Sequence, residues 1–364
     1  MKIFTDLHHF DLFHSFQLLF EGRLGYKLHR PIGRDWANKG FWGLAKLDGP
    51  VATAYLSTDS GQAQEVLKPF WNSRPVEWAR FAMEMMRLGP ISRIEEGLYQ
   101  VSDLSKPGVF QQAITLDRFK EEKYDAIISS VPQHWEPFEE LRKRYQPQAK
   151  HIFHMGPGNV KWEVPKDCKN LMHHGNPRRD VLGLNQVSYC QEFNLETFCY
   201  KPDLRPQNII RSYVHWPESQ QLWDSLRLPW QFQFVGKTLG GLKDTIIETE
   251  SLANSMRNSK FIWHFKPGGE SYGHIIHNSY AVGRPAVINM QDYKGTRGGA
   301  LLEDMVTCID LTDCSPMVLR EKILEASEPA YYHKMCEVAY LRFKQVVDFD
   351  QEETLLLQFM ENLR

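Results

Sequence analysis

Short apolar runs alternate with stretches in which apolar residues recur at helical spacing. This alternation predicts β-α-β units, and therefore an α/β fold rather than a sandwich or a helical bundle. In the first half of the chain we expect strands at "MKIFT", "YKLHRP", "YDAIISSV" and "AKHIFHMG". We expect helices at "DLFHSFQLLFEGRLG", which ends at Gly25, and at "EPFEELRKRY". This half has the pattern of a Rossmann-like unit.

The alternation starts again after "KPDLRPQ", whose two prolines and charges suit a linker. Strands are expected at "NIIRSYV", "WQFQFVG", "KFIWHF" and "AVINM", with helices at "ESQQLWDSLRL", at "ETESLANSMRNS" and before "AVINM". The last stretch is helical, with a break near Asp348. We therefore predict two Rossmann-like domains facing a central cleft. Their predicted limits are 1–200 for the first domain, 201–207 for the linker, 208–335 for the second domain, and 336–364 for a helical segment able to pack back across the lobes.

Length and charge narrow the functional classes. A chain of 364 residues exceeds one ordinary core, and 42% apolar with 24% charged residues is typical of a soluble globular protein. The chain has 43 basic and 45 acidic residues, so its net charge does not indicate nucleic-acid binding. A local basic patch that binds nucleic acid is still compatible with this balance. Neither a signal peptide nor a membrane span is recognisable, so we expect a cytoplasmic protein. Six cysteines without a CxxC pair indicate neither a zinc knuckle nor a disulfide framework.

The most informative stretch is "GGESYGHIIHNSYAVGRPAVI", residues 268–288. Gly268 and Gly269 allow a tight turn directly after the strand "KFIWHF". We expect a helix to begin near Ser271 and to end before Gly283, a typical glycine at a helix C-terminus. The turn lies at the carboxyl end of a strand, where open α/β sheets bind their ligands.

A helix N-terminus at this position favours an anion. The amides of Tyr272, Gly273 and His274 are predicted to be first-turn donors without partners in the helix. Such amides, together with the helix dipole, attract phosphate groups. Gly273 has no side chain and would let a ligand approach the backbone. A purely structural turn is the competing interpretation.

From Glu270 to Val287 the segment resembles the donor-binding segment of retaining GT-B glycosyltransferases, the large GT4-like group. The domain order matches more loosely over the chain. The resemblance implies that Glu270 contacts the donor sugar and that the helix N-terminus holds the diphosphate of a nucleotide-diphosphate sugar. Asn278 stands where that family often has a second Glu, which holds the ribose hydroxyls. An Asn can bond a diol only without charge assistance.

The resemblance gives a candidate donor site and no metal or cofactor. A Lys or Arg would stabilise the departing diphosphate in place of a metal ion. The expected donor-binding residues are Gly268, Gly269, Ser271, Tyr272, Gly273, His274, Asn278, Arg211, Lys237 and Lys266.

The N-terminal half carries a second partial match. "HIFHMGPGN" resembles the "T-x-H" segment of the same family, in which a His reaches the donor sugar from the first lobe. His154 takes that place, and with Glu270 it is our candidate catalytic residue. The alternative is a histidine satisfied inside the sheet. Asp6, His8 and His9 follow the first strand and are candidates for the acceptor side.

The resulting hypothesis is a glycosyltransferase that transfers a sugar with retention and without a metal to an unidentified glycan, lipid-linked or nucleic-acid acceptor. Two alternatives stay open. One is a phage-type glycosyltransferase acting on modified DNA bases, against which the low net charge argues. The other is a sugar-nucleotide epimerase, or a sugar-nucleotide binder without activity, on the same fold. The sequence does not determine the oligomeric state.

Overall fold

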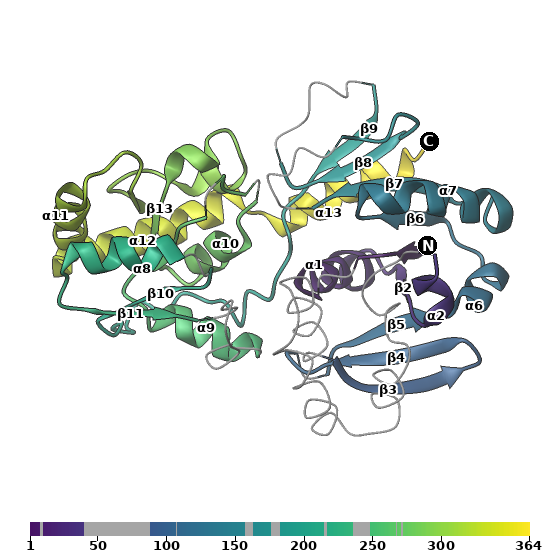
Figure 1. The fold of residues 1–364 in the computed structure, drawn as a ribbon, viewed down its shortest axis with the longest axis horizontal. Helices are drawn as coiled ribbons and strands as arrows, with labels where there is room; N and C mark the ends of the chain where they lie inside the picture. The colour runs from purple at the N-terminus through teal and green to yellow at the C-terminus, as the bar shows by residue number, and fades with distance from the viewer. Residues whose placement is uncertain are drawn as a thin grey trace.

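A computed structural model of the chain describes residues 1–7, 10–39, 88–106, 108–156, 163–175, 183–214, 217–235, 248–266, 268–270 and 272–364. Two lobes are visible, each built around one sheet (Figure 1). Within these ranges, the structure contains no helix of the length and hydrophobicity needed to cross a membrane.

The first sheet has nine strands in the order β3-β4-β5-β2-β1-β6-β7-β8-β9. The strands are β1 (Lys2–Thr5), β2 (Lys27–Pro31), β3 (Leu88–Glu95), β4 (Leu98–Asp103), β5 (Phe110–Ile114), β6 (Ala126–Ser129), β7 (Lys150–Met155), β8 (Asn170–His173) and β9 (Asn185–Ser188). The run from β5 through β2 and β1 to β9 is parallel, whereas β3, β4 and β5 pair antiparallel. The four strands predicted in this half are present as β1, β2, β6 and β7. The antiparallel strands were not predicted.

The described helices of the first lobe are α1 (Phe10–Phe16), the π-helix η1 (Gln17–Arg23), α2 (Arg34–Ala37), α6 (Leu116–Glu121) and α7 (Pro132–Tyr145). The two predicted helices are present with shifted ends, as α1 with η1 and as α7, whereas α2 and α6 were not predicted. The stretch predicted as one helix is thus divided into α1 and η1, and Gly25 follows at φ 65°. Parallel strands covered by helices have two buried faces, and the four residues of β6 are all buried.

The second sheet has five parallel strands in the order β11-β10-β12-β13-β14. The strands are β10 (Ile209–Ser212), β11 (Gln231–Phe234), β12 (Ile262–His264), β13 (Ala286–Ile288) and β14 (Cys308–Asp310). The helical elements around it are α8 (Pro217–Leu226), α9 (Thr249–Arg257), α10 (His274–Ala281), the 3₁₀ helices η4 (Met290–Tyr293) and η5 (Gly298–Leu301), α11 (Pro316–Ala326) and α12 (Pro329–Val346). This is the doubly wound order in which the chain moves to the other side of its first strand between β11 and β12.

Each lobe has its own apolar core, and the chain changes core twice. Tyr189 packs in the core of the first lobe, whereas Cys190 packs in that of the second. Helix α12 packs against α10 in the second lobe. The last helix, α13 (Phe349–Glu361), returns to the first sheet and lies beside β9 (Figure 1). Leu356 and Met360 of α13 are buried in the first core. The predicted linker at 201–207 lies after the first change of core, and the domain limits stay a prediction.

Candidate functional site

The turn between β12 and α10 lies at the switch point of the second sheet. Strands β10 and β12 are neighbours, but the chain passes through β11, on the far side of β10, before it forms β12. At such a point the loops leave the carboxyl edge in opposite directions, and doubly wound folds bind ligands there. The three residues of β12 are fully buried, so this edge has a rigid base.

Glycines shape the turn. Gly268, Gly269 and Gly273 have φ values of 77°, 62° and 73°, and residues other than glycine rarely adopt this left-handed backbone conformation. At Gly269 a Cβ atom would lie 2.4 Å from the carbonyl oxygen of Asp292, so this position has no room for a side chain. The predicted tight turn is therefore present.

The helix begins later than predicted. Its first residue is His274 rather than one near Ser271, because Gly273 adopts a left-handed conformation that no right-handed helix accommodates. The first-turn donors therefore come from His274 onwards, and the amide of Tyr272 lies outside the helix. At the other end, the amide of Arg284 donates to Ser279 O at 2.7 Å, and Gly283 has φ 67°. This is the Schellman end that the sequence predicts.

Glu270 and Lys266 form an ion pair within the turn. The Glu270 side chain is 14% exposed and the Lys266 side chain is 37% exposed. Both groups lie between the end of β12 and the start of α10, as expected for a site that handles a charged ligand. Ser271 lies outside the described residues.

Two buried histidines support this turn from below. His264, at the end of β12, bonds Tyr293 Oη through Nε2 at 2.8 Å, and burial lowers the pKa of His264 to about 4. His277 stacks on the Tyr272 ring with centroids 3.8 Å apart and bonds Gly273 O through Nδ1 at 3.0 Å. Burial lowers the pKa of His277 to about 3. Both imidazoles are therefore neutral at pH 7, and their contacts stabilise the turn without adding charge to it.

The predicted side-chain ligands of α10 are mostly buried. Tyr272 is fully buried and donates its hydroxyl to Gln191 O at 2.9 Å. Asn278 is 1% exposed, and among the residues that the structure describes its Oδ1 has no hydrogen-bond partner. The structure therefore does not support the expected ribose contact, because the Asn278 side chain faces the interior. His274 is half-buried at the start of the helix. Among the described residues no group of three or more His, Cys, Asp or Glu side chains is arranged to hold a metal ion.

Arg211 does not reach this turn. Its guanidinium bonds Ser255 O and Ser259 Oγ, both at 3.1 Å, and Gln233 Oε1 at 2.9 Å. The structure does not support its predicted contact with a diphosphate, because Gln233 of β11 and two serines at and after the end of α9 accept from its guanidinium. Lys237 lies outside the described residues.

His154 is inside the first sheet, which corrects its predicted role. The residue is fully buried, with Nε2 at 2.9 Å from Tyr189 Oη and 3.2 Å from His174 Nε2. Phe16 of α1 packs edge-on against its ring. Burial lowers the pKa of His154 to about 3. A neutral, enclosed imidazole has no access to a donor sugar, so the alternative of a histidine inside the sheet describes its position better, although among the described residues its Nδ1 has no hydrogen-bond partner.

Asp6 has a structural role at the corresponding edge of the first sheet. Its Oδ1 accepts the Ser130 amide at 2.7 Å and its Oδ2 bonds His134 Nδ1, at the start of α7. Asp6 is 1% exposed. Its predicted contact with an acceptor is therefore not supported, because both carboxylate oxygens already have partners. His8 and His9 lie outside the described residues.

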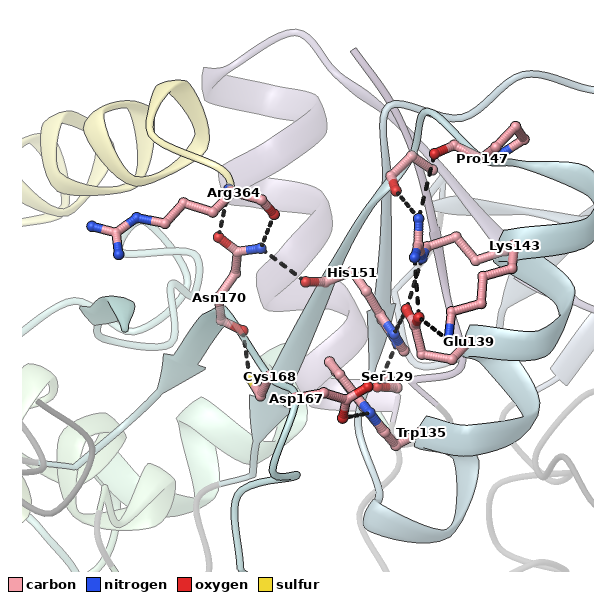
Figure 2. A network of polar contacts seen from close by, with 12 residues as sticks. Ser129, Trp135, Glu139, Lys143, Pro147, His151, Asp167, Cys168, Asn170 and Arg364 are labelled. Carbon is pink, nitrogen blue, oxygen red and sulfur yellow. Dashed lines mark hydrogen bonds and ion pairs between the residues drawn. The ribbon is translucent and has the colours of Figure 1, made fainter. Parts of the chain in front are cut away.

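A Ser-His-Glu arrangement also occurs in the first lobe (Figure 2). His151 bonds Ser129 Oγ at 3.0 Å and Glu139 Oε1 at 2.7 Å. Although these contacts resemble those of a nucleophilic triad, Ser129 is fully buried, and Trp135 stacks on the imidazole with centroids 3.7 Å apart. A substrate cannot reach this serine, so the cluster stabilises the packing of α7 on the sheet.

Comparison with known proteins gives the fold. No protein-family model and no curated protein matches the chain. Among solved structures, Anabaena HepE in complex with UDP is 10% identical, with 100% of both chains covered and a TM-score of 0.57. Sucrose-phosphate synthase from Thermosynechococcus elongatus is 11% identical over 100% of this chain and 98% of that chain, with a TM-score of 0.56. An alpha-glucosyltransferase, AGT, in complex with UDP is 10% identical over 99% of each chain, with a TM-score of 0.56.

The chain has the GT-B fold. This confirms the predicted pair of Rossmann-like domains. Two residues near the turn were missed from the sequence: His264, inside a buried strand, and Arg297, which lies between the lobes. For Arg297, the pattern "GTRGG" could have indicated its place, because an Arg beside two glycines is typical of a tight loop.

Proposed function

We propose that this chain is a glycosyltransferase that uses a nucleotide-diphosphate sugar as donor. The observation that carries the proposal is the turn between β12 and α10. It combines left-handed glycines, the Lys266–Glu270 pair and a helix N-terminus at the switch point of the second sheet. The GT-B fold supports a nucleotide-sugar donor, because the solved structures with this fold include HepE in complex with UDP and with UDP-glucose.

Different groups of the turn bind the diphosphate and the sugar of the donor. First-turn amides of α10 bind the diphosphate, with the positive end of the helix dipole behind them. Lys266 leaves Glu270 and neutralises the phosphate charge, which its 37% exposed side chain permits. Glu270, released from Lys266, accepts hydrogen bonds from the sugar hydroxyls. When the donor binds, Lys266 therefore contacts the phosphates instead of Glu270, and Glu270 contacts the sugar instead of Lys266.

Lys266 and the N-terminus of α10 also stabilise the negative charge that develops in the transition state. As the glycosidic bond to the diphosphate breaks, negative charge grows on the leaving oxygen, where Lys266 and the helix N-terminus stabilise it. We propose that these groups act in place of a metal ion and that transfer proceeds with retention, as the resemblance implies. UDP is the proposed nucleotide, because HepE and AGT were solved with it.

A transfer assay tests the proposal. The purified chain is incubated with UDP-glucose, with EDTA, and with glycan, lipid-linked and DNA acceptors in parallel. We expect UDP release that depends on one acceptor class, persists in EDTA, and is lost in Glu270→Gln but kept in Glu303→Gln, a surface carboxylate. Proton NMR of the product then gives its anomeric configuration. If UDP-glucose binds without turnover on any acceptor, the chain is a binder. If the free sugar nucleotide is interconverted, it is an epimerase.

A further inference from the structure

The chain passes between the lobes twice, and the two passages lie close together. The first passage runs from Tyr189, in the first core, to Cys190, in the second core. The return passage runs from Phe349, in the second core, to Leu356, in the first core. Glu352 lies within this return passage, at the start of α13.

Arg297 binds both passages. Its Nε and Nη2 donate to the Oγ and the carbonyl oxygen of Ser188, each at 2.9 Å. Its Nη1 lies 2.7 Å from Glu352 Oε1 and 2.8 Å from Cys190 Sγ. The Arg297 side chain is 22% exposed and that of Glu352 is 6% exposed. The planar guanidinium, with its five donors, can hold all of these acceptors at once, which the point charge of a lysine cannot do.

The residues after Arg297 press directly on the candidate donor turn. At Gly298 a Cβ atom would lie 2.6 Å from Tyr272 O, which belongs to the turn. On the other side, Gly269 has no room for a Cβ against Asp292 O. The backbones of 292–299 and 268–273 are therefore in contact, and a displacement of Arg297 moves the wall of the turn.

We propose that Arg297 is a positioning residue that fixes the turn carrying Glu270 relative to the first lobe by clamping the two interlobe passages. This inference rests on the proposed function and deepens it. The groups proposed to bind the donor all belong to the second lobe, so the clamp sets the alignment of the donor with the acceptor held by the first lobe. Loss of the clamp is therefore expected to lower kcat and to leave the donor Kd nearly unchanged.

The test uses Arg297→Met, Arg297→Lys and Glu352→Gln in the full chain, with Arg342→Met as control. Arg342 pairs with Glu303 on the surface of the second lobe. For Arg297→Met we expect kcat to fall at least tenfold while the Kd for UDP changes less than threefold. Arg297→Lys recovers part of kcat because it keeps the charge pair with Glu352. Glu352→Gln lowers kcat at least threefold, and Arg342→Met behaves as wild type.

Hydrogen exchange separates this inference from the proposed function. In ligand-free Arg297→Met, the amide of His277, which donates to Gly273 O at 3.1 Å at the start of α10, is expected to exchange at least tenfold faster, with β12 and β13 unchanged. This result in a protein without transfer activity would support the clamp and refute the proposed function. Unchanged exchange and kcat in all three variants would overturn the clamp. A loss of UDP binding parallel to kcat would also overturn it, because a general structural defect lowers both.

Discussion

Lowering the pH from 7.5 to 5.5 should remove much of the folding stability, because burial lowers the pKa of six histidines in the folded state: His29, His151, His154, His174, His264 and His277. Burial lowers the pKa of His29 and His264 to about 4 and that of His154 and His277 to about 3. In the unfolded chain each titrates near its ordinary value of 6.5. Since the unfolded state binds more protons below that value, stability is complete above pH 6.5 and falls as the pH drops toward 4.

The magnitude follows from the separation of the two pKa values. At pH 5.5 an unfolded histidine is about nine-tenths protonated and a folded one is almost neutral, so each of the four costs about 1.4 kcal/mol. Together they remove about 5 kcal/mol, against about 5 to 15 kcal/mol for the stability of a typical protein. These four contribute a local slope of about 5 kcal/mol per pH unit, and His151 and His174, whose pKa values burial also lowers, add to it. Glu21 and Glu192 oppose the trend only near their own titration, because burial raises the pKa of both.

Urea denaturation followed by tryptophan fluorescence at pH 7.5, 6.5 and 5.5, at constant ionic strength, measures this loss. His154→Gln serves as the internal control, because removing one of these histidines should reduce the slope at pH 5.5 by about 1.2 kcal/mol per pH unit. A free energy of unfolding that differs by less than about 1 kcal/mol between pH 7.5 and 5.5 would refute the reasoning. It would mean that these imidazoles either gain protons in the folded state or are not enclosed.

Three further predictions concern single side chains. Gly283→Ala should destabilise the protein by at least about 2 kcal/mol, because the new Cβ would lie 2.3 Å from the Tyr200 ring at φ 67°. Gly25→Ala, at φ 65° with open space around it, should cost only about 1 kcal/mol in thermal unfolding, and equal losses would contradict the steric argument. Glu139→Gln should cost about 2 kcal/mol in urea at pH 7, because hydrogen bonds from His151 and Arg142 outweigh burial and hold the pKa of Glu139 well below its usual range. An unchanged midpoint would show that the ionised carboxylate is not needed. Lys266→Met should weaken UDP binding about tenfold in calorimetry while Lys266→Arg keeps most of it, and equal binding by both would remove Lys266 from the site.

The parts of the site that could be predicted are local in sequence. Glu270 and Lys266 were each expected in the turn that the glycines indicate, and the structure adds that the two side chains, four residues apart, form an ion pair. The helix start was placed too early because the left-handed conformation of Gly273 cannot be read from residue types alone. A glycine at the N-terminus of a helix is compatible with either start.

The remaining parts depend on contacts between distant segments. Arg297 meets Ser188 and Glu352, which lie 109 and 55 residues away, and no periodicity reveals such a meeting. His154 stands in a strand whose middle is buried on both faces, so the pattern could not say whether its imidazole faces a ligand or Tyr189. The antiparallel strands β3 to β5 lie outside the β-α-β alternation from which the fold was predicted.

The most direct test of the donor site is calorimetric titration of UDP and of UDP-glucose into the wild type and Glu270→Gln. If Glu270 holds the sugar and α10 holds the diphosphate, the substitution should weaken UDP-glucose about tenfold and leave UDP unchanged or tighter, because a carboxylate near the phosphates is removed. Equal weakening of both ligands would contradict this division of roles. Failure of both ligands to bind the wild type at millimolar concentration would contradict the site itself.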